Sequence, residues 1–144
     1  VLNDPVNAID PSGLWTAGID LSGSAAALLG FTGGVTFAID DNLNVAAIPH
    51  AGGMYLVGAG ASVAAQVQVT SANTVYDLGG WATSFGGSAG YLVGGTAEYI
   101  QGNGYQGLSA GVYLGPGLLP VSIQYQAEHA WVFGTNLSDT DCAK

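Results

Sequence analysis

The chain has 144 residues, of which 49% are hydrophobic, 8% are charged and 24 are glycine. A chain of this length and composition can bury a core, so we expect one globular domain and exclude a disordered chain. Ten acidic residues stand against a single basic one, Lys144, which gives a formal net charge of −9. Without arginine or internal lysine, the chain cannot neutralise a nucleic-acid backbone, and it has no basic cluster for anionic membrane surfaces.

Apolar residues alternate with small or polar residues through most of the chain, which predicts β-strands. The predicted strands, in chain order, are residues 15–21, 35–39, 45–48, 55–69, 81–85, 91–100, 107–114 and 121–133. As one straight strand, residues 55–69 would extend roughly 50 Å at about 3.3 Å per residue. We therefore expect a bend or bulge near Gly58 and Gly60.

Clusters of turn-forming residues separate these strands, at 40–44, 71–73, 101–104 and 115–117. Asn103-Gly104 is typical of a hairpin turn, because both residues tolerate a positive φ. We predict an all-β fold, an antiparallel meander of about eight strands that forms a small barrel or a two-layer sandwich. Residues 25–39 are too few and too rich in glycine for a transmembrane helix.

The N-terminus contains two Asp-Pro steps and a Pro-Ser-Gly turn, in the segment Asn3-Asp4-Pro5-Val6-Asn7-Ala8-Ile9-Asp10-Pro11-Ser12-Gly13-Leu14. This segment resembles the end of the RHS (YD-repeat) associated core, which closes a large β-cocoon and precedes a variable C-terminal region. The resemblance implies an RHS-core-like terminal segment at residues 1–14, followed by a single glycine-rich β domain at residues 15–144. It also implies an extracellular or cell-surface location. Some members of that family autoproteolyse at such aspartates, a role that would fall on Asp10; we favour a turn-forming Asp-Pro step.

Candidate catalytic side chains are few. A nucleophilic mechanism requires a base, and only His50 and His129 are present. His50 follows Pro49 in an expected loop with no carboxylate nearby in sequence, and His129 lies on the apolar face of the last predicted strand, as a buried or interface histidine would. Glu98 and Glu128 could form the carboxylate pair of a glycosidase, but each falls on the polar face of a strand, where we expect a solvated carboxylate. We predict no catalytic residue and no enzymatic activity.

Metal and cofactor sites have little support in the sequence. Residues 40–44 begin like a calcium loop, but Val45 replaces the expected glycine and Ala51 the closing glutamate, so we predict a hairpin turn. Cys142 is the only cysteine and cannot form an intrachain disulfide. Asn136 begins a glycosylation-type tripeptide, a pattern that is common by chance. We predict no metal site and no cofactor.

Three functions remain open. Our leading prediction is a non-enzymatic extracellular module that assembles into a homo-oligomer or polymer, such as a filament in which the N-terminal segment adds as a strand to a neighbour's edge. It rests on the missing catalytic residues and on an expected polar, uncharged surface. The alternative is a secreted toxin domain that inserts into or permeabilises membranes. An enzymatic toxin with an unrecognised site is the third. The first two differ in whether the apolar faces of the strands point inward to a core or outward to lipid.

Overall fold

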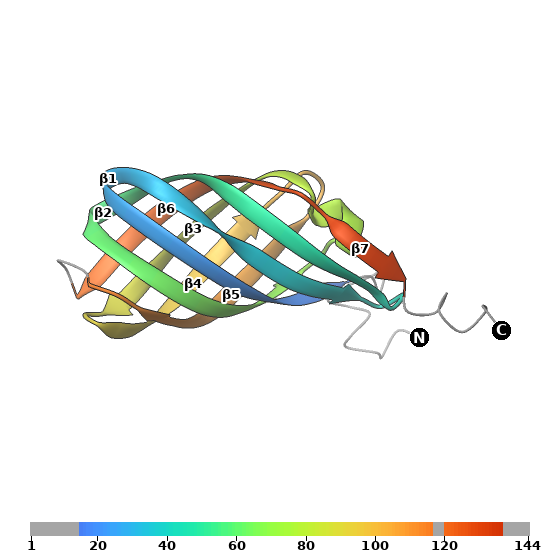
Figure 1. Cartoon of the computed structure of the whole chain (residues 1–144), viewed down its shortest axis with the longest axis horizontal. Helices are drawn as coiled ribbons and strands as arrows, with labels where there is room; N and C mark the ends of the chain where they lie inside the picture. The colour runs from blue at the N-terminus through green and yellow to red at the C-terminus, as the bar shows by residue number, and fades with distance from the viewer. Residues whose placement is uncertain (1–14, 117–119, 137–144) are drawn as a thin grey trace, which may run out of the picture.

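The computed structural model describes residues 15–116 and 120–136. The RHS-like segment, Asp10, Cys142 and Lys144 lie outside these ranges, as do the last two residues of the glycosylation-type tripeptide. The described chain is all-β and antiparallel, as predicted, with seven strands in one sheet that closes into a barrel (Figure 1).

The strands are β1 (Thr16–Asp40), β2 (Asn44–Thr70), β3 (Gly80–Gly90), β4 (Val93–Gln101), β5 (Gln106–Leu114), β6 (Val121–Ala130) and β7 (Phe133–Asn136). One short 3-10 helix, η1 (Val75–Leu78), connects β2 to β3. The neighbours run in the order β1-β2-β5-β4-β3-β6, and β7 pairs with β2. The sheet closes because β2 pairs with β5 through residues 63–70 and with β6 through residues 50–56.

Strands β1 and β2 form one long hairpin that doubles back on itself (Figure 1). Each reverses direction midway, β1 at Leu28 with a φ of 71° and β2 near Gly58 with a φ of 125°. The two arms of β1 then lie side by side: a Cβ added to Gly34 would lie 2.3 Å from the carbonyl oxygen of Leu21, so only glycine fits there. The bend predicted near Gly58 is therefore a complete reversal. The arms of β1 and β2 form separate parts of the barrel wall.

The two ends of the barrel differ. One end, which we call the η1 end, holds η1, the β1–β2 turn at residues 41–43 and the β4–β5 turn at Asn103-Gly104. In that second turn Gly104 has a φ of 86°, and the amide of Gly102 donates to the carbonyl of Tyr105 at 3.0 Å, as expected for a tight hairpin. The opposite end, which we call the Leu28 end, holds the reversals of β1 and β2 and the β3–β4 turn at residues 91–92.

Asp40 organises the η1 end. Its buried carboxylate accepts hydrogen bonds from the backbone amides of Asn42 and Asn44, both at 3.0 Å, and from the Asn44 side chain at 2.8 Å. A fourth bond, from the amide of Val75 at 3.1 Å, holds η1 to the turn. Burial alone would raise the pKa of Asp40, but these hydrogen bonds outweigh it and lower the pKa below its ordinary value. Residues 40–44 are thus a hairpin turn, as predicted.

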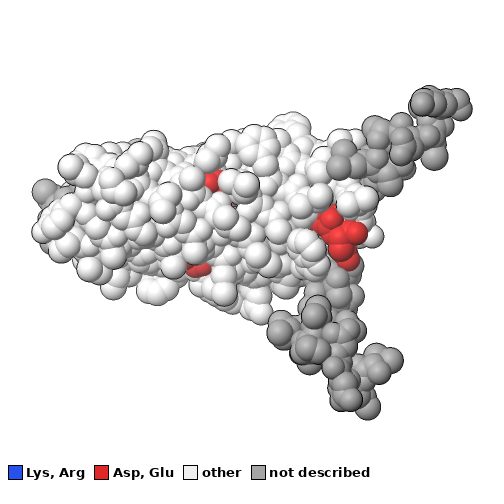
Figure 2. Space-filling model, turned by 90° about the horizontal axis from the view of Figure 1, so that it is seen from below, with Lys and Arg blue, Asp and Glu red and all other residues white. Residues whose placement is uncertain are grey.

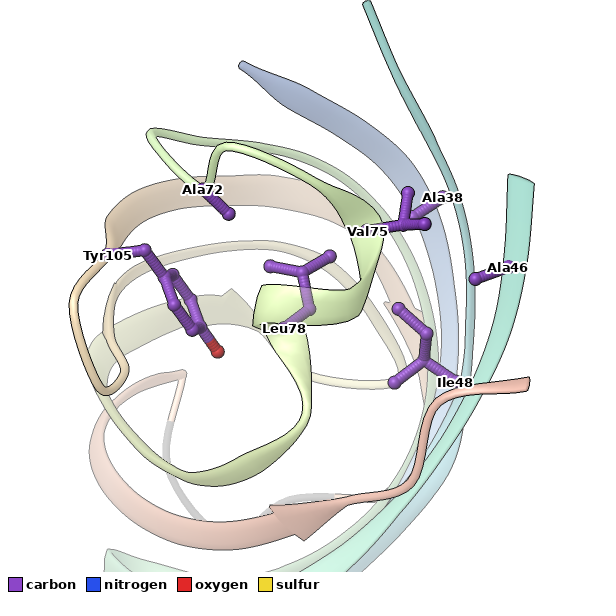
Figure 3. Close-up of a cluster of buried hydrophobic side chains, with 7 residues drawn as sticks. All are labelled: Ala38, Ala46, Ile48, Ala72, Val75, Leu78 and Tyr105. Atoms are coloured by element: carbon purple, nitrogen blue, oxygen red, sulfur yellow. The ribbon is translucent and has the colours of Figure 1, made fainter. Parts of the chain in front are cut away.

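The hydrophobic core of the described chain also lies at the η1 end (Figure 3). Val75 and Leu78 of η1 point into the barrel mouth, where they meet Ile48 and Tyr105. Three alanines, Ala38, Ala46 and Ala72, complete the cluster. η1 therefore acts as an apolar plug over one end of the barrel.

Candidate functional site: an inverted barrel

The apolar faces of the strands point outward. In the second arm of β2, Gln66 and Thr70 are buried in the interior, whereas Val67 and Val69 are exposed. The other strands of the wall repeat this alternation, and Phe31 in β1 is 80% exposed. We expected a polar, uncharged surface, and this prediction is wrong, because the polar residues line the interior.

The large exposed apolar side chains of β1 to β6 form a continuous surface that we call the outer wall. Its members come from all six strands: Ile19, Leu21, Phe31, Phe37, Tyr55, Val63, Val67, Phe85, Tyr99, Leu108, Val112, Ile123 and Tyr125. Soluble monomers rarely expose apolar patches of more than a few hundred Å². Larger exposed apolar surfaces are typical of regions that contact a membrane or another protein.

Charge is nearly absent from this surface. Among the described residues, the exposed carboxylates are Asp41 and Asp77, and both lie at the η1 end. Figure 2 shows the largest acidic patch at that end, whereas the visible flank is uncharged except for two small acidic areas. The described ranges contain no lysine or arginine.

The three tryptophans of the chain, Trp15, Trp81 and Trp131, are all exposed near the η1 end. Trp81 and Trp131 flank His129 on the outer face, with ring centroids 5.3 Å and 4.7 Å from the imidazole. The described chain therefore carries an aromatic band where the apolar wall gives way to the charged end.

Inside the barrel, His50 lies between two carboxylates. Its Nε2 is 2.7 Å from Oδ1 of Asp20, its Nδ1 is 3.0 Å from Oε2 of Glu128, and Thr36 donates to the same Asp20 oxygen at 2.8 Å. An imidazolium at His50 would therefore be paired with a carboxylate at each ring nitrogen, and such pairing offsets the cost of burying the charge. We expected a loop around His50, and this prediction is wrong. His50 lies in β2, and its carboxylate partners come from β1 and β6.

Glu98 is also an interior residue rather than the solvated carboxylate that we expected. It is buried, and its Oε1 accepts hydrogen bonds from the amide groups of Gln124 and Gln126. Glu128 likewise faces inward, toward His50. Neither glutamate stands in open solvent.

The interior holds two small polar hollows, of about 80 Å³ and about 90 Å³. The two hollows adjoin each other, because both are bordered by Ser22, Thr32, Gln66, Glu98 and Gln126. The larger one reaches Leu78 and Tyr105 and so ends against the η1 plug. Ligand pockets usually measure about 300–1,000 Å³, so these spaces suit water molecules rather than an organic substrate.

Neither a metal centre nor a known relative points to a function. Within residues 15–116 and 120–136, no group of three or more His, Cys, Asp or Glu side chains is placed to hold a metal ion. In the same ranges, no helix is long and apolar enough to cross a membrane. Comparison with protein-family models, curated proteins and solved structures finds no match.

Proposed function

We propose that this chain inserts into lipid bilayers as a β-barrel, with the outer wall against hydrocarbon and the polar side chains in the interior. The observation that carries the proposal is the inverted alternation of the strands, apolar outward and polar inward. Transmembrane barrels require this pattern, because their outer residues contact lipid and their inner residues do not. A soluble barrel of this size would place its large apolar side chains inside.

The strand lengths support the same proposal. A strand that crosses a bilayer at a tilt needs about 9–11 residues. β3 has 11 residues, β4 and β5 have 9 each, and β6 has 10. The barrel wall is therefore of the right height to span the hydrocarbon layer.

The closed sheet and its interior hydrogen bonds remove the main obstacles to insertion. Every unpaired backbone group in hydrocarbon costs several kcal/mol, so a spanning sheet must close on itself. Here the pairing of β2 with both β5 and β6 closes it. Interior side chains pair with one another between neighbouring strands, as Ser109 of β5 does with Gln66 of β2 at 2.6 Å and Ser88 of β3 with Ser122 of β6 at 2.6 Å.

The proposed state is an inserted domain with a filled interior rather than an open channel. The two hollows are small, and η1 covers one mouth. Delivery outside the producing cell, as the RHS-like segment implies, would bring the domain to the membranes of other cells. The self-assembling module remains the competing prediction, because copies of the chain could also cover the outer wall.

Flotation with vesicles tests the proposal. Protein mixed with neutral phosphatidylcholine vesicles should rise with them in a density gradient and stay with them in high salt, since the contact is apolar rather than electrostatic. Protein that remains at the bottom of the gradient and sediments as a large homo-oligomer without lipid would contradict insertion and favour self-assembly. A vesicle-entrapped dye should show no sustained release after insertion, because the interior is filled.

A further inference from the structure

We infer that the barrel enters the bilayer with its Leu28 end first and keeps its η1 end in the water on the side from which it came. The inference rests on the proposed insertion and adds a direction to it. It follows from the unequal chemistry of the two ends.

The Leu28 end presents apolar side chains to its surroundings. Leu29 is 72% exposed and Leu92 is 68% exposed, and Leu28 and Tyr91 are exposed beside them. The described residues of this end include no Asp, Glu, Lys or Arg, and its two reversals contain the positive φ values of Leu28 and Gly58. Such an end can pass into hydrocarbon without carrying a charge with it.

The η1 end cannot do so. Asp41 and Asp77 are exposed there, and Asp40 is held as a carboxylate by four hydrogen bonds, since its pKa is lowered. Moving this end across the bilayer would require the two exposed carboxylates to leave water together.

The aromatic band lies at the boundary between the η1 end and the outer wall. Tryptophan is enriched at the boundary between hydrocarbon and water, where its ring sits at the level of the lipid headgroups. Trp15, Trp81 and Trp131 lie close to the charged turns, whereas the described residues of the Leu28 end include no tryptophan; the exposed rings there are those of Tyr91 and of Tyr55, which pairs with Leu29. The band would therefore hold the η1 end at the surface of entry.

Single cysteines on the two ends test the direction. In a Cys142→Ser background, Asn42→Cys and Asn73→Cys report the η1 end and keep both of its exposed carboxylates, whereas Leu29→Cys and Leu92→Cys report the Leu28 end. All four positions are exposed, so the substitutions leave the core intact. Each variant is added to preformed phosphatidylcholine vesicles, floated, and treated from outside with a membrane-impermeant maleimide, with and without detergent.

We expect the cysteines of the η1 end to react at the same rate with and without detergent. Those of the Leu28 end should react at least tenfold more slowly until detergent is added. Equal labelling of both ends, or protection of the η1 end, would overturn the inferred direction while leaving insertion intact. Failure of all variants to float would overturn insertion itself and the direction with it.

Discussion

Substitution of a central residue of the outer wall by lysine gives a quantitative test of lipid contact. Phe85 lies in the middle of β3, is 58% exposed, and pairs with Tyr99 of β4 and Tyr125 of β6. On the lipid face of a barrel, lysine at the bilayer midplane costs about 2–4 kcal/mol, whereas near the interface the cost falls to about 0–1 kcal/mol. Because each 1.4 kcal/mol is a factor of ten, Phe85→Lys should weaken partition into vesicles by about 30-fold to about 700-fold.

Asn73→Lys is the matched control. Asn73 is exposed in the loop before η1, so the same charge is added at the end that is expected to stay in water. This variant should partition within about fivefold of the wild type, which corresponds to a cost below about 1 kcal/mol. Partition is measured by flotation over a series of lipid concentrations. Equal partition of the two lysine variants would refute lipid contact at Phe85, and so would a Phe85→Lys variant that binds as well as the wild type.

Two further predictions concern the interior and the fold. His50→Ala should lower the free energy of unfolding by about 3–5 kcal/mol at neutral pH, because it leaves Asp20 and Glu128 facing each other without a cation; denaturant titration that shows no loss would contradict this pairing. Gly34→Val should prevent folding, since a Cβ there would lie 2.3 Å from a backbone oxygen of the other β1 arm; a β-type circular dichroism spectrum equal to that of the wild type would show that the arms are not so close.

Local patterns in the sequence predicted much of the fold. Period-two alternation located the strands, and glycine and asparagine located the turns at residues 40–44 and 103–104. These signals are local, because they depend on the backbone conformation of a few consecutive residues. The doubling back of β1 at Leu28 was not predicted, because leucine rarely adopts a positive φ and gives no turn signal.

The sequence pattern did not reveal which face of the strands points inward. An alternating strand has the same period whether its apolar face meets a core or lipid, so the pattern identifies two faces without assigning them. One signal was present: Gln66 and Gln68 in β2, and Gln124 and Gln126 in β6, place pairs of long polar side chains on a single strand face. Such pairs on the face opposite valine and tyrosine suit a narrow polar interior.

The cluster of His50, Asp20 and Glu128 in the interior could not be predicted from the sequence, for a different reason. His50 meets Asp20 and Glu128 only because the arms of β1 and β2 and strand β6 surround the same space. No spacing within the chain indicates such a meeting, since the contacts depend on the strand order of the closed barrel. Glu98 has hydrogen-bond partners from β6 for the same reason.

The most direct test of the account is the environment of Phe85 in the presence of vesicles. A spin label attached to Phe85→Cys in a Cys142→Ser background reports, by power saturation, its access to oxygen, which concentrates in hydrocarbon, and to a water-soluble nickel complex. Insertion predicts high access to oxygen and almost none to the nickel complex. Equal access to both would place the outer wall in water, and access to neither would place it in a protein–protein contact; either result would contradict a lipid-facing wall.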